Sequence, residues 1–170
     1  SGKPACRTTD SGGRDHFYGH AEKSAKIAED FLKEYRFDNK TIADVLQLIR
    51  VHDDHYHGTR ENVRREMNRV GQELFPSYLK LILADNLAKS CYALEEFMPR
   101  YERFRKLYEE ILQEGDPITL KDLAVKGSDL IAAGMKPGPE MGKVLDRMLN
   151  DVLGEPAHNN KEYLINTYIK

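Results

Sequence analysis

The 170-residue sequence has only two cysteines, almost no net charge and no long apolar run. Cys6 and Cys91 stand alone and form no CxxC pair, which excludes a disulfide framework and a cysteine metal site. The formal net charge of −2 excludes binding to nucleic acid through bulk charge, so any RNA contact must come from a local basic patch. No segment is apolar enough for a membrane span, and the first residues do not resemble a signal peptide. We therefore expect a globular protein of the reducing cytoplasm.

The sequence also lacks the period-2 alternation of β-strands and has no internal repeat. Apolar residues instead recur at helical spacing over residues 21–35 and again over residues 42–49. Asp38 and Thr41 separate these stripes and are expected to cap the second helix, and Thr59 is expected to cap a third. The predicted fold is all-α.

The later part of the chain is expected to contain a long helix after Pro76 and a charged amphipathic helix over residues 99–113. Shorter helices are predicted over residues 119–125, 128–133 and 139–153 and after Asn160, with residues 1–15 forming a loop. These boundaries predict a helical bundle over residues 1–97, a connecting helix over residues 98–116 and a small C-terminal helical unit over residues 117–170.

Five of the six histidines lie between residues 16 and 57. His20 opens one predicted helix, His52 ends the next, and Asp85 lies within an otherwise apolar segment. A buried aspartate is costly unless it is paired or bound to a metal, and imidazole and carboxylate groups from separate helices are suitable ligands for a divalent metal. The alternative is that these residues cap helices and form local hydrogen bonds, because no HExxH-like spacing is present.

Basic residues form a second candidate site, which consists of two arginine pairs at i, i+4 spacing and two lysines: Arg60, Arg64, Arg65, Arg69, Lys80 and Lys89. Such a stripe could follow RNA phosphates, although Glu61, Glu66 and Glu73 interleave with it as they would on an ordinary solvated face. Lys136 and Gly138 lie in a turn before Pro139, where the free N–H groups of a helix start could bind a phosphate. The alternative for this turn is a tight connection without a ligand.

Three blocks of the sequence resemble the HD-domain part of the bacterial tRNA nucleotidyltransferase and poly(A) polymerase family: residues 17–25, 48–53 and 83–88. Residues 63–65, 70–75, 120–123 and 127–134 are similar to later parts of the same family, so the resemblance covers nearly the whole chain. It implies an HD-type bundle that is partial, because the family's His-Asp doublet normally precedes a Gly-Lys pair and here Gly2-Lys3 follows Ser1 directly.

The resemblance implies that His20, His52 and Asp85 occupy the remaining HD-site positions and bind a divalent metal (Mg, Mn or Ni) weakly. It also implies that the nucleotidyltransferase head with its catalytic carboxylates lies outside this chain, so no catalytic residue is predicted within it. The expected function is to hold tRNA so that its 3′ end reaches that head for CCA addition. CCA addition and poly(A) addition are not distinguished here, because the discriminating residues lie in the head.

Two other functions stay open: an HD-type metal-dependent phosphohydrolase acting on nucleotides or cyclic phosphates, and a helical adaptor without activity. Loss of the helix that carries the doublet is also expected to uncover an apolar face and to allow a homodimer through it. The residues predicted for this face are Ala25, Ala28, Ile42, Val45 and Ile49.

Overall fold

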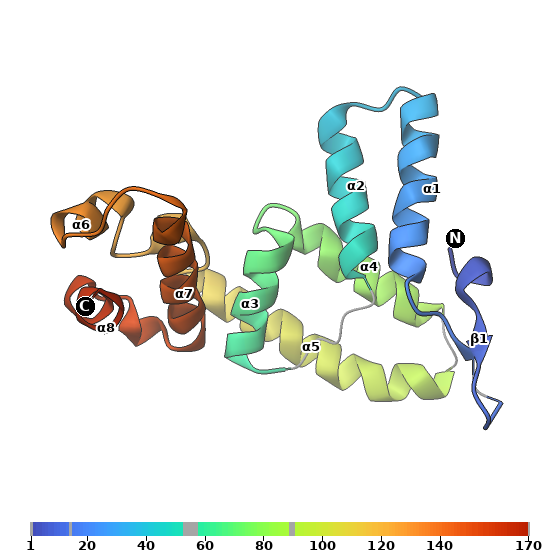
Figure 1. Cartoon of the computed structure of the whole chain (residues 1–170). Helices are drawn as coiled ribbons and strands as arrows, with labels where there is room; N and C mark the ends of the chain where they lie inside the picture. The colour runs from blue at the N-terminus through green and yellow to red at the C-terminus, as the bar shows by residue number, and fades with distance from the viewer. Residues whose placement is uncertain (1, 14, 53–57, 89–90, 170) are drawn as a thin grey trace. The chain divides into compact units, whose positions relative to one another are not determined.

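The computed structural model describes residues 2–13, 15–52, 58–88 and 91–169, excluding the side chains of residues 91–93. Within these ranges the regular secondary structure is helical except for one short pair of strands, which confirms the predicted all-α class (Figure 1). The chain forms two compact units, one of Ser1–His55 with Val70–Phe97 and one of Tyr56–Arg69 with Met98–Lys170. The predicted domains over residues 1–97, 98–116 and 117–170 stay a prediction.

The first unit begins with a short 3-10 helix, η1 (Pro4–Cys6), and a two-stranded antiparallel pair, β1 (Thr8–Thr9) and β2 (Asp15–His16). Thr8 lies opposite His16, and the Thr9 hydroxyl donates to Asp15 Oδ1 at 2.8 Å. The sequence predicts only a loop here, because strands of two residues are too short to show alternation.

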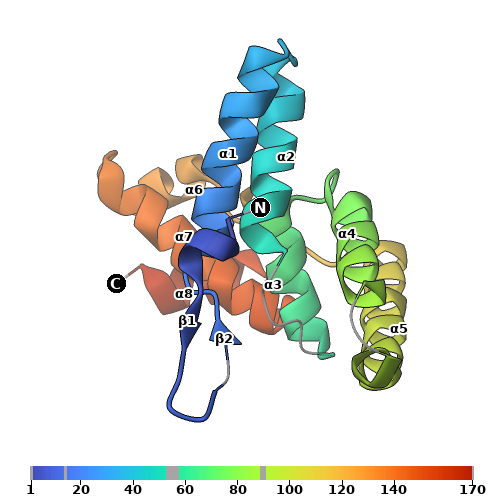
Figure 2. The same ribbon diagram turned by 90° about the vertical axis from the view of Figure 1, so that its right-hand side faces the viewer.

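Helices α1 (His20–Glu34) and α2 (Asn39–Val51) lie side by side (Figures 1 and 2). The Asp38 carboxylate caps α2 by accepting from the Thr41 N–H at 2.9 Å, as predicted. The apolar face that was expected to be uncovered is instead the contact between the two helices. Ala25 and Ile42 are buried there with Leu32 and Leu46, and Ala28, Val45 and Ile49 pack against them. That part of the prediction is wrong, because the two stripes cover each other.

Helix α4 (Phe75–Leu87) and the start of α5 (Cys91–Glu114) complete the first unit. Phe75 and Tyr78 are fully buried, and Pro76 lies in the first turn of α4, where its missing N–H costs nothing. Pro99 lies inside α5, although the sequence predicts a helix that begins there. Phe97 and Tyr101 are both buried, and their burial on either side of Pro99 stabilises a helix that the proline alone would interrupt.

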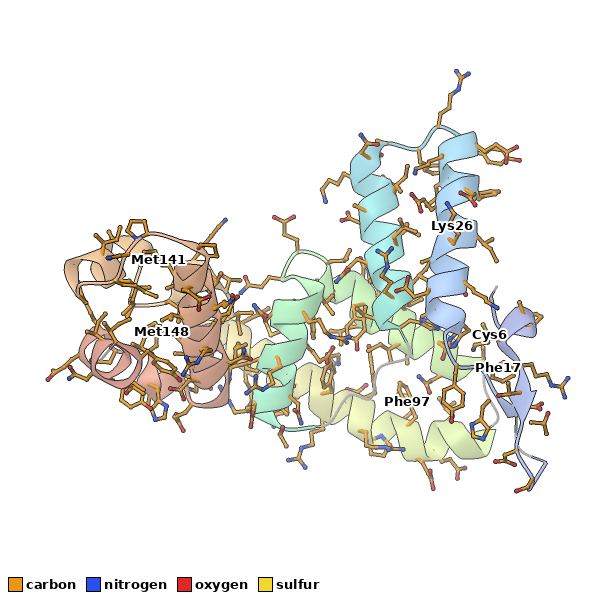
Figure 3. All side chains as sticks on the ribbon, viewed as in Figure 1. Cys6, Phe17, Lys26, Phe97, Met141 and Met148 are labelled. Carbon is orange, nitrogen blue, oxygen red and sulfur yellow. The ribbon has the colours of Figure 1, made fainter. Side chains whose placement is uncertain are left out.

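The second unit contains α3 (Arg60–Val70, its last residue excepted), the rest of α5, and the C-terminal elements η2 (Leu120–Asp122), α6 (Gly127–Ala132), α7 (Pro139–Gly154), η3 (Pro156–His158) and α8 (Lys161–Tyr168). Thr59 Oγ1 accepts from the Asn62 N–H at 3.3 Å, which confirms the predicted cap of α3. Met148 and Leu164 are fully buried in the C-terminal core, and Met141 packs against it (Figure 3).

The segment predicted as a helix over residues 119–125 is only a single 3-10 turn. Thr119 and Asp122 form a reciprocal capping box around this turn, which satisfies its backbone N–H groups without a longer helix. The backbone extends at Leu123, and Leu123 and Val125 then turn into the core. None of the described helices combines the length and the apolar composition needed to cross a membrane.

Candidate functional site

The side chains of His20 and His52 meet where α1 begins and α2 ends. Their Nε2 atoms are 3.3 Å apart, and their rings lie edge to face with centroids 5.2 Å apart. His20 is buried and His52 is half-buried. The antiparallel packing of α1 against α2 therefore joins two residues that are 32 positions apart in the sequence.

Hydrogen bonds to the backbone determine which nitrogen of each ring carries a proton. Nδ1 of His20 lies 2.8 Å from the Phe17 carbonyl oxygen, and Nδ1 of His52 lies 2.6 Å from that of Ile49. A carbonyl oxygen only accepts, so both Nδ1 atoms must donate. In neutral rings both Nε2 atoms then direct lone pairs at one another, and a cation between them relieves the repulsion. Histidines that ligate metals are oriented in the same way, because the ring nitrogen that does not bind the metal donates to a carbonyl or carboxylate oxygen.

The separation of the two Nε2 atoms suits a shared metal ion. Nitrogen ligands at about 2.1 Å from a tetrahedral ion lie about 3.4 Å apart, close to the distance found here. Asp85, the predicted third ligand, is half-buried on α4. No three His, Cys, Asp or Glu side chains form a group that could hold a metal, as far as the described residues go. Asp53, Asp54, His55 and His57 lie outside those residues, and the site of His20, His52 and Asp85 stays a prediction.

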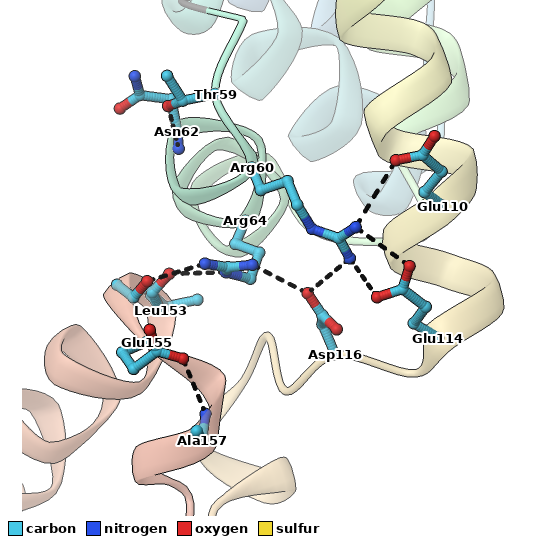
Figure 4. A network of polar contacts seen from close by, with 11 residues as sticks. Thr59, Arg60, Asn62, Arg64, Glu110, Glu114, Asp116, Leu153, Glu155 and Ala157 are labelled. Atoms are coloured by element: carbon cyan, nitrogen blue, oxygen red, sulfur yellow. Dashed lines mark hydrogen bonds and ion pairs between the residues drawn. The ribbon is translucent and has the colours of Figure 1, made fainter.

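Arg64 is one of four arginines predicted to contact RNA, and it is only 5% exposed. Its Nε donates to the Leu153 carbonyl at 2.7 Å, and its Nη2 donates to the Gly154 carbonyl at 2.9 Å (Figure 4). These carbonyls end α7, where intrahelical partners are lacking. Its Nη1 donates to Asp116 Oδ2 at 3.0 Å. Each of the three guanidinium nitrogens of Arg64 therefore donates a hydrogen bond, and two of these bonds join α3 to the end of α7.

Arg60 belongs to the same network (Figure 4). Both of its terminal nitrogens donate to the Glu114 carboxylate, and Glu110 and Asp116 lie within 3.6 Å and 3.5 Å. The hydrogen bond from Arg60 to Glu114 raises the pKa of the Arg60 guanidinium. Asp116 was not among the site residues predicted from the sequence, where it only ended the connecting helix predicted over residues 98–116. The nearby arginines were the signal that this carboxylate would be paired.

Arg65 and Arg69 are more accessible, with side chains 38% and 40% exposed. Arg65 pairs with Glu61 at 3.0 Å and donates to Asn150, and Arg69 pairs with Glu66 at 2.6 Å. Both ion pairs are of the kind expected for an ordinary solvated face, the alternative to an RNA-binding stripe, in which glutamates alternate with the arginines. RNA contact by these two arginines stays a prediction, and Lys89 lies outside the described residues.

The turn before α7 carries the last two predicted RNA contacts. Lys136 and Gly138 are exposed, and Gly138 is the N-cap residue of α7 with Pro139 following it. The Met141 N–H donates to the Gly138 carbonyl at 3.1 Å. Phosphate binding at this turn also stays a prediction.

Comparison with known proteins places these features in a family. Residues 17–167 match the family model described as "tRNA nucleotidyltransferase domain 2 putative". The chain is 36% identical over 152 residues to the CC-adding tRNA nucleotidyltransferase of Thermus thermophilus. That alignment covers 87% of this chain but only 32% of the relative, so the chain spans about a third of its length. No solved structure gives a significant match.

The family match extends over the histidine pair, the arginine network and the C-terminal helices alike. The resemblance seen in the sequence blocks is therefore confirmed over most of the chain. This chain belongs to the tRNA nucleotidyltransferase family.

Proposed function

We propose that this chain binds tRNA and positions the 3′ end for nucleotide addition by a nucleotidyltransferase head that lies outside it, in a CCA-adding enzyme of the cytoplasm. The observation that carries the proposal is the family match over residues 17–167. The relative's name states that it adds CC to tRNA. In such an enzyme the metal-assisted phosphoryl transfer belongs to the head, so the helical part contributes orientation of the RNA.

Arg65, Arg69, Lys136 and the backbone at Gly138 are the proposed RNA contacts. All four are accessible, whereas Arg64 is buried and Arg60 is held by carboxylates. An incoming phosphate can replace Glu61 or Glu66 as the partner of an exposed arginine, because exposed ion pairs contribute little to stability. Phosphate contacts orient RNA without reading its bases, so we propose no sequence preference for these contacts.

The test is the binding of fluorescently labelled tRNA to the 170-residue chain, measured by anisotropy over a range of salt concentrations. We expect binding that weakens steeply with salt. In the double variant Arg65→Glu/Arg69→Glu, affinity should drop at least tenfold and the slope of log K against log salt should shrink by about 2.

The matched control is Arg105→Glu on α5, because Arg105 is 44% exposed and also pairs with two glutamates, Glu102 and Glu109. This variant should bind tRNA as the parent does. Binding by the double variant at the parent's affinity would exclude Arg65 and Arg69 from the RNA contact. Failure of the parent to bind tRNA would refute the proposed function.

A second candidate function, metal-dependent hydrolysis of nucleotides or cyclic phosphates, is favoured by one observation: the 3.3 Å approach of His20 Nε2 to His52 Nε2. Calorimetry with Mn²⁺ or Ni²⁺ should detect weak binding that disappears in His20→Ala. His158→Ala is the control, because His158 lies in the second unit. Hydrolysis of a cyclic nucleotide to the ring-opened nucleoside monophosphate only in the presence of metal would support this function. Absence of any binding heat would remove this candidate.

A further inference from the structure

A cluster of polar aromatic residues lies where η3 and α8 return to α7. The Asp151 carboxylate on α7 accepts from His158 Nδ1 at 2.9 Å and from the Tyr168 hydroxyl at 3.1 Å. One carboxylate therefore orients two aromatic side chains from two different elements, His158 of η3 and Tyr168 of α8.

The rings of His158 and Tyr163 are stacked, with centroids 4.3 Å apart and planes inclined by 24°. Both remain accessible, the His158 side chain at 36% and Tyr163 at 37%. The Arg147 guanidinium lies 5.4 Å from the centroid of the Tyr168 ring, and Tyr168 shares Asp151 as a hydrogen-bond partner with His158. The cluster thus presents a preorganised aromatic surface with a cation beside it.

The charges of this cluster favour an anionic, planar ligand. Burial alone would raise the pKa of Asp151, but the hydrogen bonds from His158 and Tyr168 outweigh it and lower that pKa. The Asp151 carboxylate is therefore ionised and already accepts hydrogen bonds from its own donors. Arg147 is exposed and forms no ion pair with a described residue, whereas Lys143 and Lys161 are paired with Glu140 and Asp129. Arg147 is thus the accessible cation of the cluster.

A purely structural role would be to hold α8 against α7, but other residues already do this. Leu164 of α8 is fully buried in the core. The Asn160 side chain caps α8 by accepting from the Glu162 and Tyr163 N–H groups. The Asn159 side chain accepts from the Ala124 N–H and donates to the Asp122 carbonyl. Attachment of α8 therefore does not require an exposed, stacked ring pair.

We propose that His158 and Tyr163 form a stacking platform for an unpaired or terminal nucleobase of RNA, and that Arg147 contacts the adjoining phosphate. Sequence-independent recognition of unstacked bases combines an aromatic face with a nearby cation, which is the combination present here. The proposal rests on the proposed tRNA binding and names a contact for it in the C-terminal helices.

The experiment compares the 170-residue chain with Tyr163→Ala in binding labelled tRNA. Loss of one stacked base should weaken binding by about 5- to 100-fold. Tyr163→Phe keeps the ring and should bind within about twofold of the parent, since stacking uses the ring face. Tyr35→Ala is the control, because Tyr35 is a more exposed tyrosine directly after α1 and lies outside the platform.

A second measurement does not depend on how well a variant folds. Transcripts with 2-aminopurine at one unpaired position at a time should show a change of fluorescence at one position when the parent chain binds, because stacking alters the emission of this base. Circular dichroism checks that Tyr163→Ala is folded.

The outcomes separate the two proposals. If the parent binds tRNA but Tyr163→Ala binds equally well, or if no 2-aminopurine position responds, the platform is refuted and the proposed tRNA binding stands. If the parent does not bind tRNA, the proposed function itself fails. Loss of affinity in Tyr163→Ala that Tyr163→Phe restores would support the platform.

Discussion

The neighbouring residues Arg64 and Arg65 on α3 differ in burial and in their hydrogen-bond partners. Arg64 is 5% exposed and donates to two carbonyls and to Asp116, whereas Arg65 is bound to Glu61 and Asn150 at the surface. Breaking a buried charged contact leaves its partners unsatisfied, while an exposed pair is replaced by water. Burial thus decides whether an arginine stabilises the fold or stays accessible to a ligand.

We predict that Arg64→Met lowers the free energy of unfolding by about 3 kcal/mol, because Asp116 and the last carbonyls of α7 lose their donor. The neighbouring Arg65→Met should cost less than about 1 kcal/mol. Urea denaturation followed by circular dichroism measures both values. Equal costs for the two variants would contradict the structural role of Arg64.

Asp151 should make stability depend on pH in the acidic range. Burial of the carboxyl opposes ionisation, but the hydrogen bonds from His158 and Tyr168 outweigh it, so the folded-state pKa is below the ordinary value of 3.8. The stabilisation is therefore complete above that ordinary value and is lost as the pH falls through the lower folded-state pKa. Urea denaturation between about pH 6 and pH 2 should show a shallower acid loss in Asp151→Asn than in the parent. Parallel curves would contradict this assignment.

At the scale of the helix, α1 carries two apolar stripes with different surroundings. Leu32 is buried against α2, whereas the preceding residue, Phe31, is 53% exposed. Phe31 contacts Tyr35, and the centroids of their rings are 4.5 Å apart. Helical periodicity alone does not say which stripe a neighbouring helix covers.

The two adjacent residues therefore provide a matched test of this packing. Leu32→Ala should lower the free energy of unfolding by about 2–4 kcal/mol, because it leaves a cavity between α1 and α2. Phe31→Ala should cost less than about 1 kcal/mol, since an exposed side chain leaves none. Thermal unfolding of both variants measures the difference, and a reversed order would mean that α1 packs through its other stripe.

For the whole molecule, the face predicted for a homodimer is covered by the packing of α1 against α2, so we propose another face for such a dimer. The exposed stripe of α1 consists of Ile27, Phe31 and Tyr35. Lys23 lies near the start of this helix and Glu34 at its end, both exposed. An antiparallel pair of α1 helices from two copies would therefore bring opposite charges together beside the apolar contact.

Sedimentation velocity at micromolar concentration should detect this dimer, and Phe31→Glu should make the chain monomeric. Leu112→Glu is the control, because Leu112 is a similarly exposed apolar residue on α5. A parent chain that sediments as a monomer would contradict the homodimer. If both Phe31→Glu and Leu112→Glu sediment as monomers, the dimer contact is not specific to α1.

Local patterns in the sequence were sufficient for the all-α class, the caps at Asp38 and Thr59, and membership of the family. Each depends on residues within a few positions or on aligned blocks, so no knowledge of packing was needed. Contacts between distant residues decided the rest. Arg64 is buried because the end of α7 lies beside it, and the two carbonyls that it binds are 89 and 90 positions later in the sequence. Which apolar stripe of α1 stays uncovered depends on where α2 packs. Side-chain periodicity identifies the faces of a helix, but only the tertiary structure determines which face is covered and by what.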